Sequence, residues 1–249
     1  MCWLCILRVH ILTGSPALSL SLLPPPFLPL PLALPLSLSL SEQDYVDLYL
    51  IHWPGSAKTN TSSPKNRENR LASWRALEEA QAEGLARHIG VSNFCQKHLE
   101  DLVAHARVPP AVNQVEFHAE YWDRPLRQYC EAHSILIQGY SPLGSPEGKD
   151  SLLAQPPVVD IAARLRLSRA QVLIKWVLQR TNGRSVVFRS SKAERLAENL
   201  AAAATPPLTE EDLARIDDIT APAGGEDGAH ANPGTHAGTK YCWDPSEIA

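Results

Sequence analysis

The sequence predicts an α/β fold in which parallel strands alternate with crossover helices. From Tyr45 onward, short apolar runs alternate with stretches whose apolar residues recur at helical spacing, a pattern typical of repeated β–α units. Glycines, prolines and helix-capping residues separate these segments. The pattern indicates about five consecutive β–α units, and an eight-stranded (β/α)8 barrel requires three more. The predicted architecture is therefore an incomplete barrel.

Each predicted strand is a short apolar run bounded by polar or turn-forming residues. Because the sequence between the runs has a helical pattern, neighbouring strands are expected to lie parallel. The runs are Val46–Ile51, Ile89–Val91, Ala111–Val115, Ile135–Gln138 and Ser185–Phe188.

The first predicted helix follows a polar loop that extends through Asn69. Leu71, Trp74 and Leu77 fall on one helical face, and Gly84 suits the C-terminal end of this helix. Later helices are expected to begin at capping residues. They are placed over residues 99–106, from Asp123, over 158–165, over 170–179 with a Ser168–Gln171 capping box and a stop at Gly183, over 193–203, and over 209–219 after Thr209.

Composition narrows the classes of protein. A net charge of −4 and a charged fraction of 20% fit one globular domain and argue against a nucleic-acid-binding surface, which is normally basic. The five cysteines are scattered and odd in number, which indicates a reducing compartment. Cys2 and Cys5 have CxxC spacing, but no second pair or nearby histidine completes a zinc site, so no metal is expected.

Residues 1–40 have a different composition, with fourteen leucines, seven prolines and one charged residue, Arg8. The prolines interrupt any continuous helix, which weakens a signal-peptide or membrane-anchor interpretation without removing it. The favoured interpretation is a disordered low-complexity segment. The predicted organisation is this segment, a folded domain over residues 41–222, and a C-terminal loop over residues 223–249.

Polar side chains lie at or directly after the ends of the first three predicted strands. His52 comes after Val46–Ile51, Ser92 and Asn93 follow the second strand, and Gln114 lies in the third. In a barrel, the carboxyl ends of the strands form the functional face. A lone histidine is often structural, and serine, asparagine and glutamine at strand ends often serve only as turns or caps. On these residues alone, a functional role and a purely structural role both stay open.

Four motifs, in order, resemble those of the aldo-keto reductases. They are Asp44-Tyr-Val-Asp-Leu-Tyr-Leu-Ile-His52-Trp-Pro54, Ile89-Gly-Val-Ser92-Asn93-Phe94, Val112-Asn113-Gln114-Val115-Glu116 and Gly139-Tyr140-Ser141-Pro-Leu143-Gly144. The resemblance covers residues 44–220. It implies a (β/α)8 TIM barrel and a cytoplasmic, monomeric oxidoreductase that uses NADP(H) to reduce aldehydes or ketones. It implies neither a nucleic-acid nor a membrane partner.

The resemblance also implies roles for individual residues. His52 orients the substrate carbonyl and Trp53 lines the substrate pocket, where its alternative is an ordinary core tryptophan. The implied cofactor contacts are Ser92, Asn93 and Gln114 on the nicotinamide carboxamide, Tyr140 stacked on the nicotinamide ring, and Ser141 and Leu143 along the pyrophosphate.

The stretch from Ser185 to Asn199 resembles the adenosine-phosphate site of the family. A 2′-phosphate requires cations and hydrogen-bond donors, and a helix N-terminus favours anions. Arg189, Ser190 and Arg195 are the implied phosphate contacts, with Glu198 and Asn199 near the adenine; the alternative is a solvated basic helix start. Phe188 and Arg189 replace the usual proline and lysine, a change that keeps the positive charge.

The family's catalytic tyrosine, lysine and aspartate lie on segments that precede the first matching strand. Residues 1–40 contain no tyrosine, lysine or aspartate, so His52 alone matches the catalytic set. Three hypotheses therefore stand: a carbonyl reductase, a non-catalytic nucleotide-binding or regulatory protein, and a truncated product without a stable fold.

Overall fold

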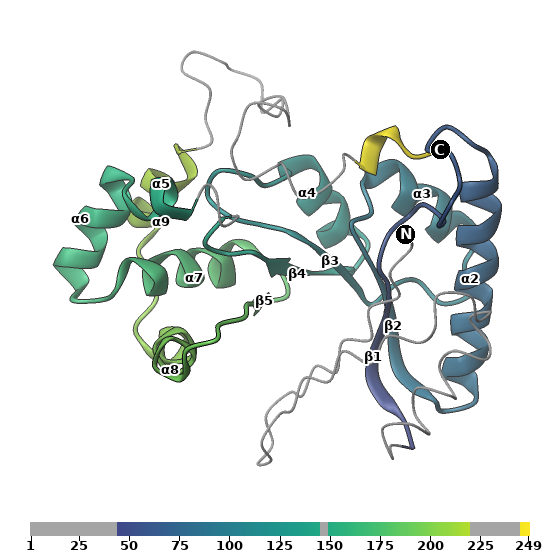
Figure 1. Cartoon of the computed structure of the whole chain (residues 1–249), viewed down its shortest axis with the longest axis horizontal. Coiled ribbons are helices and arrows are strands. Elements are labelled where there is room, and N and C mark those ends of the chain that lie inside the picture. Colours follow the sequence, from purple (N-terminus) through teal and green to yellow (C-terminus); the bar gives the residue numbers. More distant parts are fainter. Residues whose placement is uncertain (1–43, 145–148, 220–244) are drawn as a thin grey trace. The chain divides into compact units, whose positions relative to one another are not determined.

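A computed structural model describes residues 44–144, 149–219 and 245–249. The described residues contain a sheet of five strands in the order β1-β2-β3-β4-β5, with a helix after each strand (Figure 1). This arrangement corresponds to part of a (β/α)8 barrel, so the predicted fold class is confirmed. The expectations for residues 1–40 and 220–244 lie outside the described residues. The strands are Val46–Ile51 (β1), Ala86–Ser92 (β2), Val112–Glu116 (β3), Leu136–Tyr140 (β4) and Ser185–Val187 (β5).

The chain divides into two compact units. The first contains the described residues 44–114 and 245–249, and the second contains residues 115–144 and 149–219. In the part of the chain that the structure describes, no helix is both long enough and apolar enough to cross a membrane.

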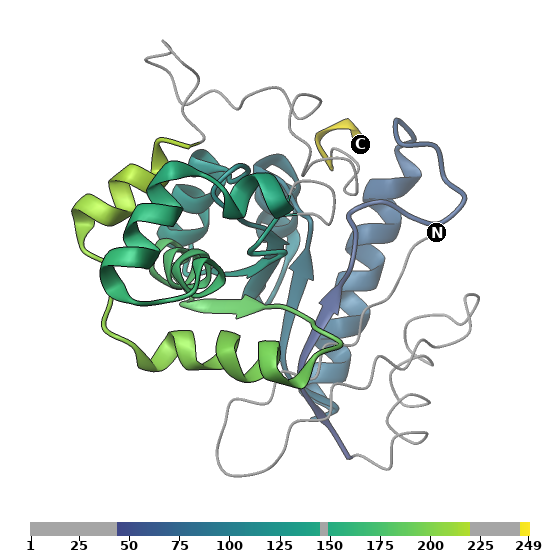
Figure 2. The ribbon, with the colours of Figure 1, turned by 60° about the vertical axis from the view of Figure 1, so that its left-hand side comes forward.

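In the first unit, β1 and β2 pair in parallel from Val46 with Ala86 to Ile51 with Val91. Helix α2 (Lys65–Ala82) lies alongside both strands in two views (Figures 1 and 2), and α3 (Gln96–His105) follows β2. The core is apolar, as burial of such side chains is the main driving force for folding. Its most buried members include Tyr49, Leu50, Trp74, Leu77, Ile89 and Leu99.

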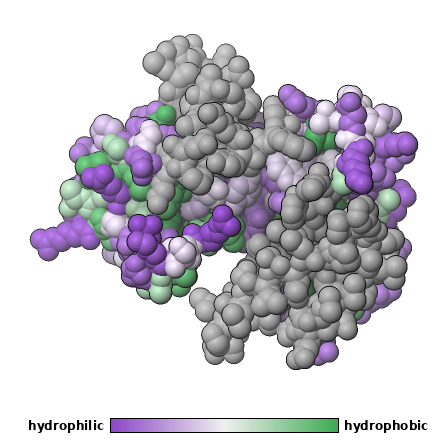
Figure 3. Space-filling model, in the orientation of Figure 1, coloured by the Kyte–Doolittle hydropathy of each residue, from purple (hydrophilic) through white to green (hydrophobic). Residues whose placement is uncertain are grey.

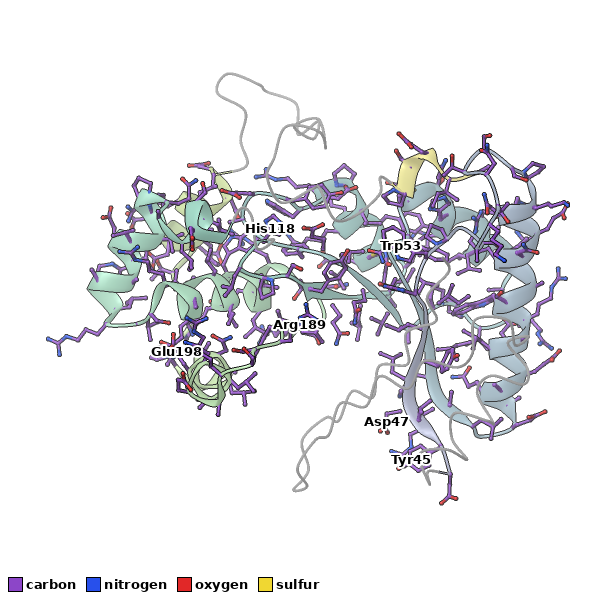
Figure 4. All side chains as sticks on the ribbon, viewed as in Figure 1. Tyr45, Asp47, Trp53, His118, Arg189 and Glu198 are labelled. Atoms are coloured by element: carbon purple, nitrogen blue, oxygen red, sulfur yellow. The ribbon has the colours of Figure 1, made fainter. Side chains whose placement is uncertain are left out.

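Gly90 permits a close approach of β2 to its neighbours. A Cβ atom at this position would lie 2.6 Å from the Val112 carbonyl oxygen and 2.7 Å from Leu50 Cδ2. Any side chain would therefore push β2 away from the start of β3. At the amino end of β1, the Arg87 guanidinium lies 4.0 Å from the centre of the Tyr45 ring and 2.8 Å from Asp47 Oδ1 (Figure 4).

Helix α2 begins earlier than the sequence indicated, so the predicted loop through Asn69 was wrong for residues 65–69. Its first turn is polar and therefore carries no apolar periodicity to mark it. Instead, the buried Asn66 side chain accepts a bond from the Ser56 N–H at 2.9 Å and donates to the Asn60 and Thr61 carbonyls at 2.8 and 3.0 Å. These bonds to the preceding loop fix the start of the helix.

In the second unit, β4 and β5 pair in parallel from Gln138 with Ser185 to Tyr140 with Val187. An aromatic cluster lies in the core, with ring centroids 5.4 Å apart for Phe117 and Trp176 and 5.7 Å apart for Trp122 and Trp176. The helices are α4 (Arg124–Ala132), α5 (Lys149–Leu153), α6 (Pro156–Leu165), α7 (Arg169–Arg180), α8 (Ala193–Ala201) and α9 (Glu210–Asp217). The short helix α5 was not expected, because five residues are too few to show a periodic pattern.

The predicted helix caps of this unit are confirmed. The Leu126 N–H donates to Asp123 Oδ1 at 2.8 Å, and capping boxes join Ser168 to Gln171 and Thr209 to Asp212. Gly183 does not end α7, which stops at Arg180. A Cβ atom on Gly183 would lie 2.8 Å from the Ile137 carbonyl oxygen, so this glycine serves the close approach to β4.

The last five residues depart from the predicted loop. Pro245–Glu247 form a 3-10 turn, and Ile248 is buried. The turn lies beside α3 (Figure 1), where Lys97 Nζ donates to the Ser246 carbonyl at 2.7 Å. This segment therefore packs as part of the first unit.

Candidate functional site

Polar residues of the first unit gather at the carboxyl ends of its strands. His52 directly follows β1, Ser92 is the last residue of β2, and Gln114 in β3 is the register partner of Ser92. Because the strands are parallel, their carboxyl ends share one edge of the sheet. The structure therefore brings His52, Ser92, Asn93 and Gln114 together, as the motifs predicted.

Asn93 links the other three residues by hydrogen bonds. Its backbone N–H donates to the Gln114 carbonyl at 2.9 Å, and its side-chain Nδ2 donates to the His52 carbonyl at 2.9 Å and to Ser92 Oγ at 3.2 Å. Asn93 has a φ of 61°, in the left-handed region that asparagine tolerates better than most residues. This backbone conformation directs the amide across the strand ends.

Ser92 is committed to the scaffold as a donor. Its hydroxyl donates to the Gln114 carbonyl at 2.7 Å, and a hydroxyl has one proton to give but two lone pairs with which to accept. Toward a ligand, Ser92 Oγ therefore acts as an acceptor. The structural interpretation of Ser92 and Asn93 as turn residues and the predicted binding role are thus compatible.

His52 and Trp53 form the aromatic part of the site. Both are half-buried, and their ring centroids lie 5.9 Å apart with an interplanar angle of 57°. Trp53 is labelled in Figure 4. Trp53 is thus less buried than a tryptophan packed wholly in the core. Trp74 and Trp176 fill that role, at 1% and 0% exposure.

In the second unit, Tyr140 ends β4 and the predicted pyrophosphate residues follow it in a turn. The Tyr140 carbonyl accepts the Phe117 N–H at 3.1 Å, and the Gly144 N–H donates to the Ser141 carbonyl at 2.9 Å. Ser141 has a φ of 53°, and Tyr140, Ser141 and Leu143 are all half-buried. These three residues therefore follow one strand end with part of each side chain accessible.

The predicted phosphate residues surround the start of α8. Arg189 and Ser190 follow β5, and Arg195 lies in the first turns of the helix (Figure 4). Both arginines are exposed, and neither forms an ion pair with another described residue. The Lys192 N–H donates to Ser190 Oγ at 3.1 Å. Hydrophilic side chains mark the surface around α8 (Figure 3).

Helix α8 is anchored to its neighbours. Gln171 on α7 donates to the Glu198 carbonyl at 2.9 Å, and the buried Lys175 donates to the Ala202 and Thr205 carbonyls at 3.3 and 2.9 Å. Desolvation lowers the pKa of Lys175. Of the two predicted adenine contacts, Glu198 is exposed whereas Asn199 is buried at 7% exposure. The exposed N-terminus and the two arginines together offer positive charge to an anion.

Sequence reasoning assigned no role to a buried pair in the second unit. His118 Nε2 lies 3.1 Å from Glu116 Oε1, and His118 Nδ1 accepts the Glu120 N–H at 3.3 Å. The neutral tautomer therefore carries its proton on Nε2 and donates it to the carboxylate. Glu116 ends the motif Val112-Asn113-Gln114-Val115-Glu116. The histidine two residues after it could have been recognised from the sequence as a candidate partner of this carboxylate. Groups of histidine, cysteine, aspartate and glutamate suited to a metal ion are absent from the described residues.

Arg70 and His98 in the first unit were also missed. His98 donates from Nε2 to the Ile248 carbonyl at 2.9 Å, and its Nδ1 lies 3.2 Å from Cys95 Sγ. Burial lowers the pKa of His98 to about 4 and raises the pKa of the Cys95 thiol. Nδ1 of the neutral imidazole therefore accepts a hydrogen bond from the Cys95 S–H, which stays protonated. Nothing in local periodicity signals the contact of His98 with Ile248, since the two residues lie 150 positions apart.

The fold defines a protein of the α/β-barrel class, and in such barrels the carboxyl ends of the strands form the functional face. The sequence profile of the aldo/keto reductase family matches residues 34–221. The chain belongs to the aldo/keto reductase family, as its motifs predicted.

Two curated relatives illustrate the similarity. The chain is 40% identical to an aldo/keto reductase of Synechocystis sp., over 70% of this chain and 57% of that protein. It is 38% identical to deoxymugineic acid synthase 1 of Hordeum vulgare, over 72% of this chain and 59% of that protein. The chain thus spans less than two thirds of the length of these relatives.

Solved structures agree with the fold. A Bombyx mori aldo-keto reductase in complex with NADP is 30% identical, with a TM-score of 0.67 over 76% of this chain and 62% of that chain. An aldo-keto reductase enzyme from a Medee basin deep-sea metagenome library is 33% identical, with a TM-score of 0.68 over 80% of this chain and 70% of that chain. Both share the barrel architecture that the five strands represent.

The buried His98 predicts a pH dependence of stability. The folded state keeps His98 neutral down to a pKa of about 4, whereas the unfolded chain takes up the proton near its ordinary value of about 6.5. The stabilisation is therefore complete above about pH 6.5 and is lost as the pH falls toward about 4. Between about pH 7.5 and pH 5, His98 should lower the free energy of unfolding by about 2 kcal/mol. Urea unfolding at both pH values measures the change.

The His98→Gln variant is the control, because a glutamine amide keeps a donor for the Ile248 carbonyl but does not titrate. Between the two pH values, the free energy of unfolding of this variant should fall by about 2 kcal/mol less than that of the unmodified chain. Equal losses in both proteins would contradict a buried neutral imidazole.

Proposed function

We propose that this chain binds NADP(H) and a small aldehyde or ketone at the carboxyl ends of its strands. The observation that carries the proposal is the set of His52, Ser92, Asn93 and Gln114, whose hydrogen bonds gather polar groups at one edge of the sheet. The Bombyx mori relative, whose structure contains NADP, supports the choice of nucleotide. A cytoplasmic location and a monomeric state belong to the same proposal.

The residues of the first unit fit a carboxamide. Ser92 Oγ offers a lone pair to an amide N–H, and the Asn93 and Gln114 side chains each carry both an amide donor and a carbonyl acceptor. A carboxamide presents the complementary groups. In the second unit, Tyr140 is half-buried at the end of β4, where its ring provides a face for stacking on the nicotinamide. Ser141 and Leu143, in the turn that follows, would border the pyrophosphate.

The residues around α8 fit a phosphate monoester. Arg189 and Arg195 are exposed cations that no described carboxylate pairs with. Ser190 adds a hydroxyl next to the helix start, and Glu198 with Asn199 would border the adenine. NAD(H) lacks the 2′-phosphate, so it cannot use this charge. The proposal therefore includes a preference for NADP(H).

His52 and Trp53 would hold the substrate. A neutral imidazole N–H hydrogen-bonds a carbonyl oxygen and stabilises the negative charge that grows there during reduction. Trp53, half-buried beside it, supplies an apolar wall. A bound nicotinamide nucleotide supplies the hydride. Within the residues that match the family, His52 is the one that resembles its catalytic set, so the proposal includes slow reduction by these 249 residues.

Arg195 provides the first test. In titrations monitored by quenching of protein fluorescence, the chain should bind NADPH more tightly than NADH. Arg195→Ala should weaken NADPH binding by about 1.5–3 kcal/mol, the usual contribution of a charged hydrogen bond, and leave NADH binding unchanged.

Arg75→Ala is the matched control, because Arg75 is an exposed arginine on α2 and its removal changes the net charge equally. It should leave both affinities unaltered. Equal affinity of the unmodified chain for NADPH and NADH would reject the phosphate site.

Turnover provides the second test. The 249-residue chain should reduce 4-nitrobenzaldehyde at least about a hundredfold more slowly than a full-length relative, since general acid catalysis contributes about 10²–10⁴ in rate. The reaction is followed by the loss of the near-ultraviolet absorbance of the reduced nicotinamide as NADPH is consumed.

Turnover at the rate of a full-length relative would show that another group in this chain donates the proton. NADPH binding without turnover would favour the alternative of a nucleotide-binding or regulatory protein. Absence of both, together with a non-cooperative unfolding curve, would favour a truncated product without a stable fold.

A further inference from the structure

The segment Pro245–Ala249, here called the strap, is fixed to the first unit along its main chain. Lys97 Nζ donates to the Ser246 carbonyl at 2.7 Å, and His98 Nε2 donates to the Ile248 carbonyl at 2.9 Å. The Ala249 N–H donates to the Thr61 carbonyl at 2.8 Å. When a peptide segment binds a protein through its main chain in this way, the bonds fix its register, and the same bonds fix the position of the strap.

Arg70 joins the strap to the loop after β1. Its Nη1 donates to the Pro54 carbonyl at 3.1 Å and to the Ala249 carbonyl at 3.2 Å, and its Nη2 lies 3.6 Å from Asp101 Oδ2. The side chain is 3% exposed, so a guanidinium has been taken out of water at considerable cost. Its planar fork holds several oxygens at fixed angles, which a lysine ammonium does not.

Ile248 fills the space beside the next residue of that loop. It is 3% exposed, and a Cβ atom built on Gly55 would lie 3.2 Å from Ile248 Cδ1. The strap therefore packs directly against the Gly55 backbone. Pro54 and Gly55, the two residues after Trp53, are each contacted by this assembly.

We propose that Arg70 is a positioning residue and that Arg70 and the strap together hold the loop 52–55, and so His52 and Trp53, in place for the substrate. This inference rests on the proposed function, in which His52 of this loop contacts the carbonyl group of the substrate. A displacement of about 1 Å at such a group reduces catalysis about a hundredfold.

The loop beyond Gly55 has a further support in addition to the bond from the Ala249 N–H to the Thr61 carbonyl. Asn66 bonds to Ser56, Asn60 and Thr61 from within α2, and none of these bonds needs the strap. A strap that served packing alone would stabilise this region or the whole unit evenly. A positioning strap acts instead on the residues between β1 and Ser56, which makes the two roles distinguishable by local measurement.

Hydrogen–deuterium exchange of the full chain tests the proposal. In Ile248→Ala, the amides of Trp53 and Gly55, within a peptide spanning residues 51–57, should exchange roughly tenfold faster than in the unmodified chain. Exchange in β2 and β4 should not change. Glu247→Ala is the matched control, because it removes an exposed side chain of the same strap, and it should leave the 51–57 peptide unaffected.

Arg70→Lys gives a second, conservative variant that retains the charge. One ammonium cannot reproduce the fork that serves both carbonyls and Asp101, so exchange in the 51–57 peptide should fall between the unmodified chain and Arg70→Met. Unchanged exchange in this peptide, in either Ile248→Ala or Arg70→Met, would overturn the proposal, even if residues 245–249 exchange faster.

A ligand readout separates positioning from general stability. With NADPH and 4-nitrobenzaldehyde, Ile248→Ala and Arg70→Lys should lower kcat/KM for the aldehyde by about fivefold or more while the NADPH dissociation constant changes less than about twofold. Parallel losses of NADPH affinity and of kcat/KM for the aldehyde would indicate a merely structural role and overturn the proposal. If the unmodified chain binds no NADPH, the proposed function fails, whereas the exchange experiment still decides whether the strap positions the loop.

Discussion

The hydrogen bonds of Asn93 join the residue after β1, the end of β2 and β3 in the first unit. Its amide donates to the His52 carbonyl and Ser92 Oγ, and its backbone N–H donates to the Gln114 carbonyl. The left-handed φ of 61° is what turns the side chain across the strand ends, and asparagine adopts it at lower cost than most residues. Without the Asn93 side chain, the His52 carbonyl and Ser92 Oγ would each lose a hydrogen-bond donor, and leaving a buried polar group without its partner costs about 1–3 kcal/mol. The placement of His52 therefore depends on Asn93 from one side and, in our proposal, on Arg70 from the other.

The two units differ in the chemistry of their polar groups. The first offers neutral donors and acceptors, which suit a carboxamide and a carbonyl. The second offers exposed arginines at a helix N-terminus, which suit a phosphate. In our proposal, charge on α8 would set which nucleotide binds, while geometry at the strand ends would set how a carbonyl is held. Family membership rests on motifs from both units, since the matched residues 34–221 span them.

Much of this arrangement was predictable from sequence, because it is encoded locally. Strand β1 has the predicted bounds, and Asp123, Ser168 and Thr209 cap the helices expected of them. The strand-end position of His52, Ser92 and Gln114 followed from the same apolar runs. The start of α2 was missed because its first turn is polar. Arg70 was missed because its partner in the strap lies 179 residues away, and no periodicity records such a contact. Gly183 was misassigned because a glycine needed for close approach looks, in sequence, like one that ends a helix.

The central proposal is that Asn93 and Gln114 contact the nicotinamide end of NADP(H) and that residues at the start of α8 contact its phosphate. The most direct measurement is a two-dimensional ¹H–¹⁵N correlation spectrum of the full chain, recorded during addition of NADP⁺. The account predicts that the side-chain amides of Asn93 and Gln114 shift together with the backbone amides of residues 190–196, at the same midpoint concentration. Shifts confined to residues 190–196 would contradict it, because they would describe a phosphate bound to α8 with no nicotinamide at the strand ends.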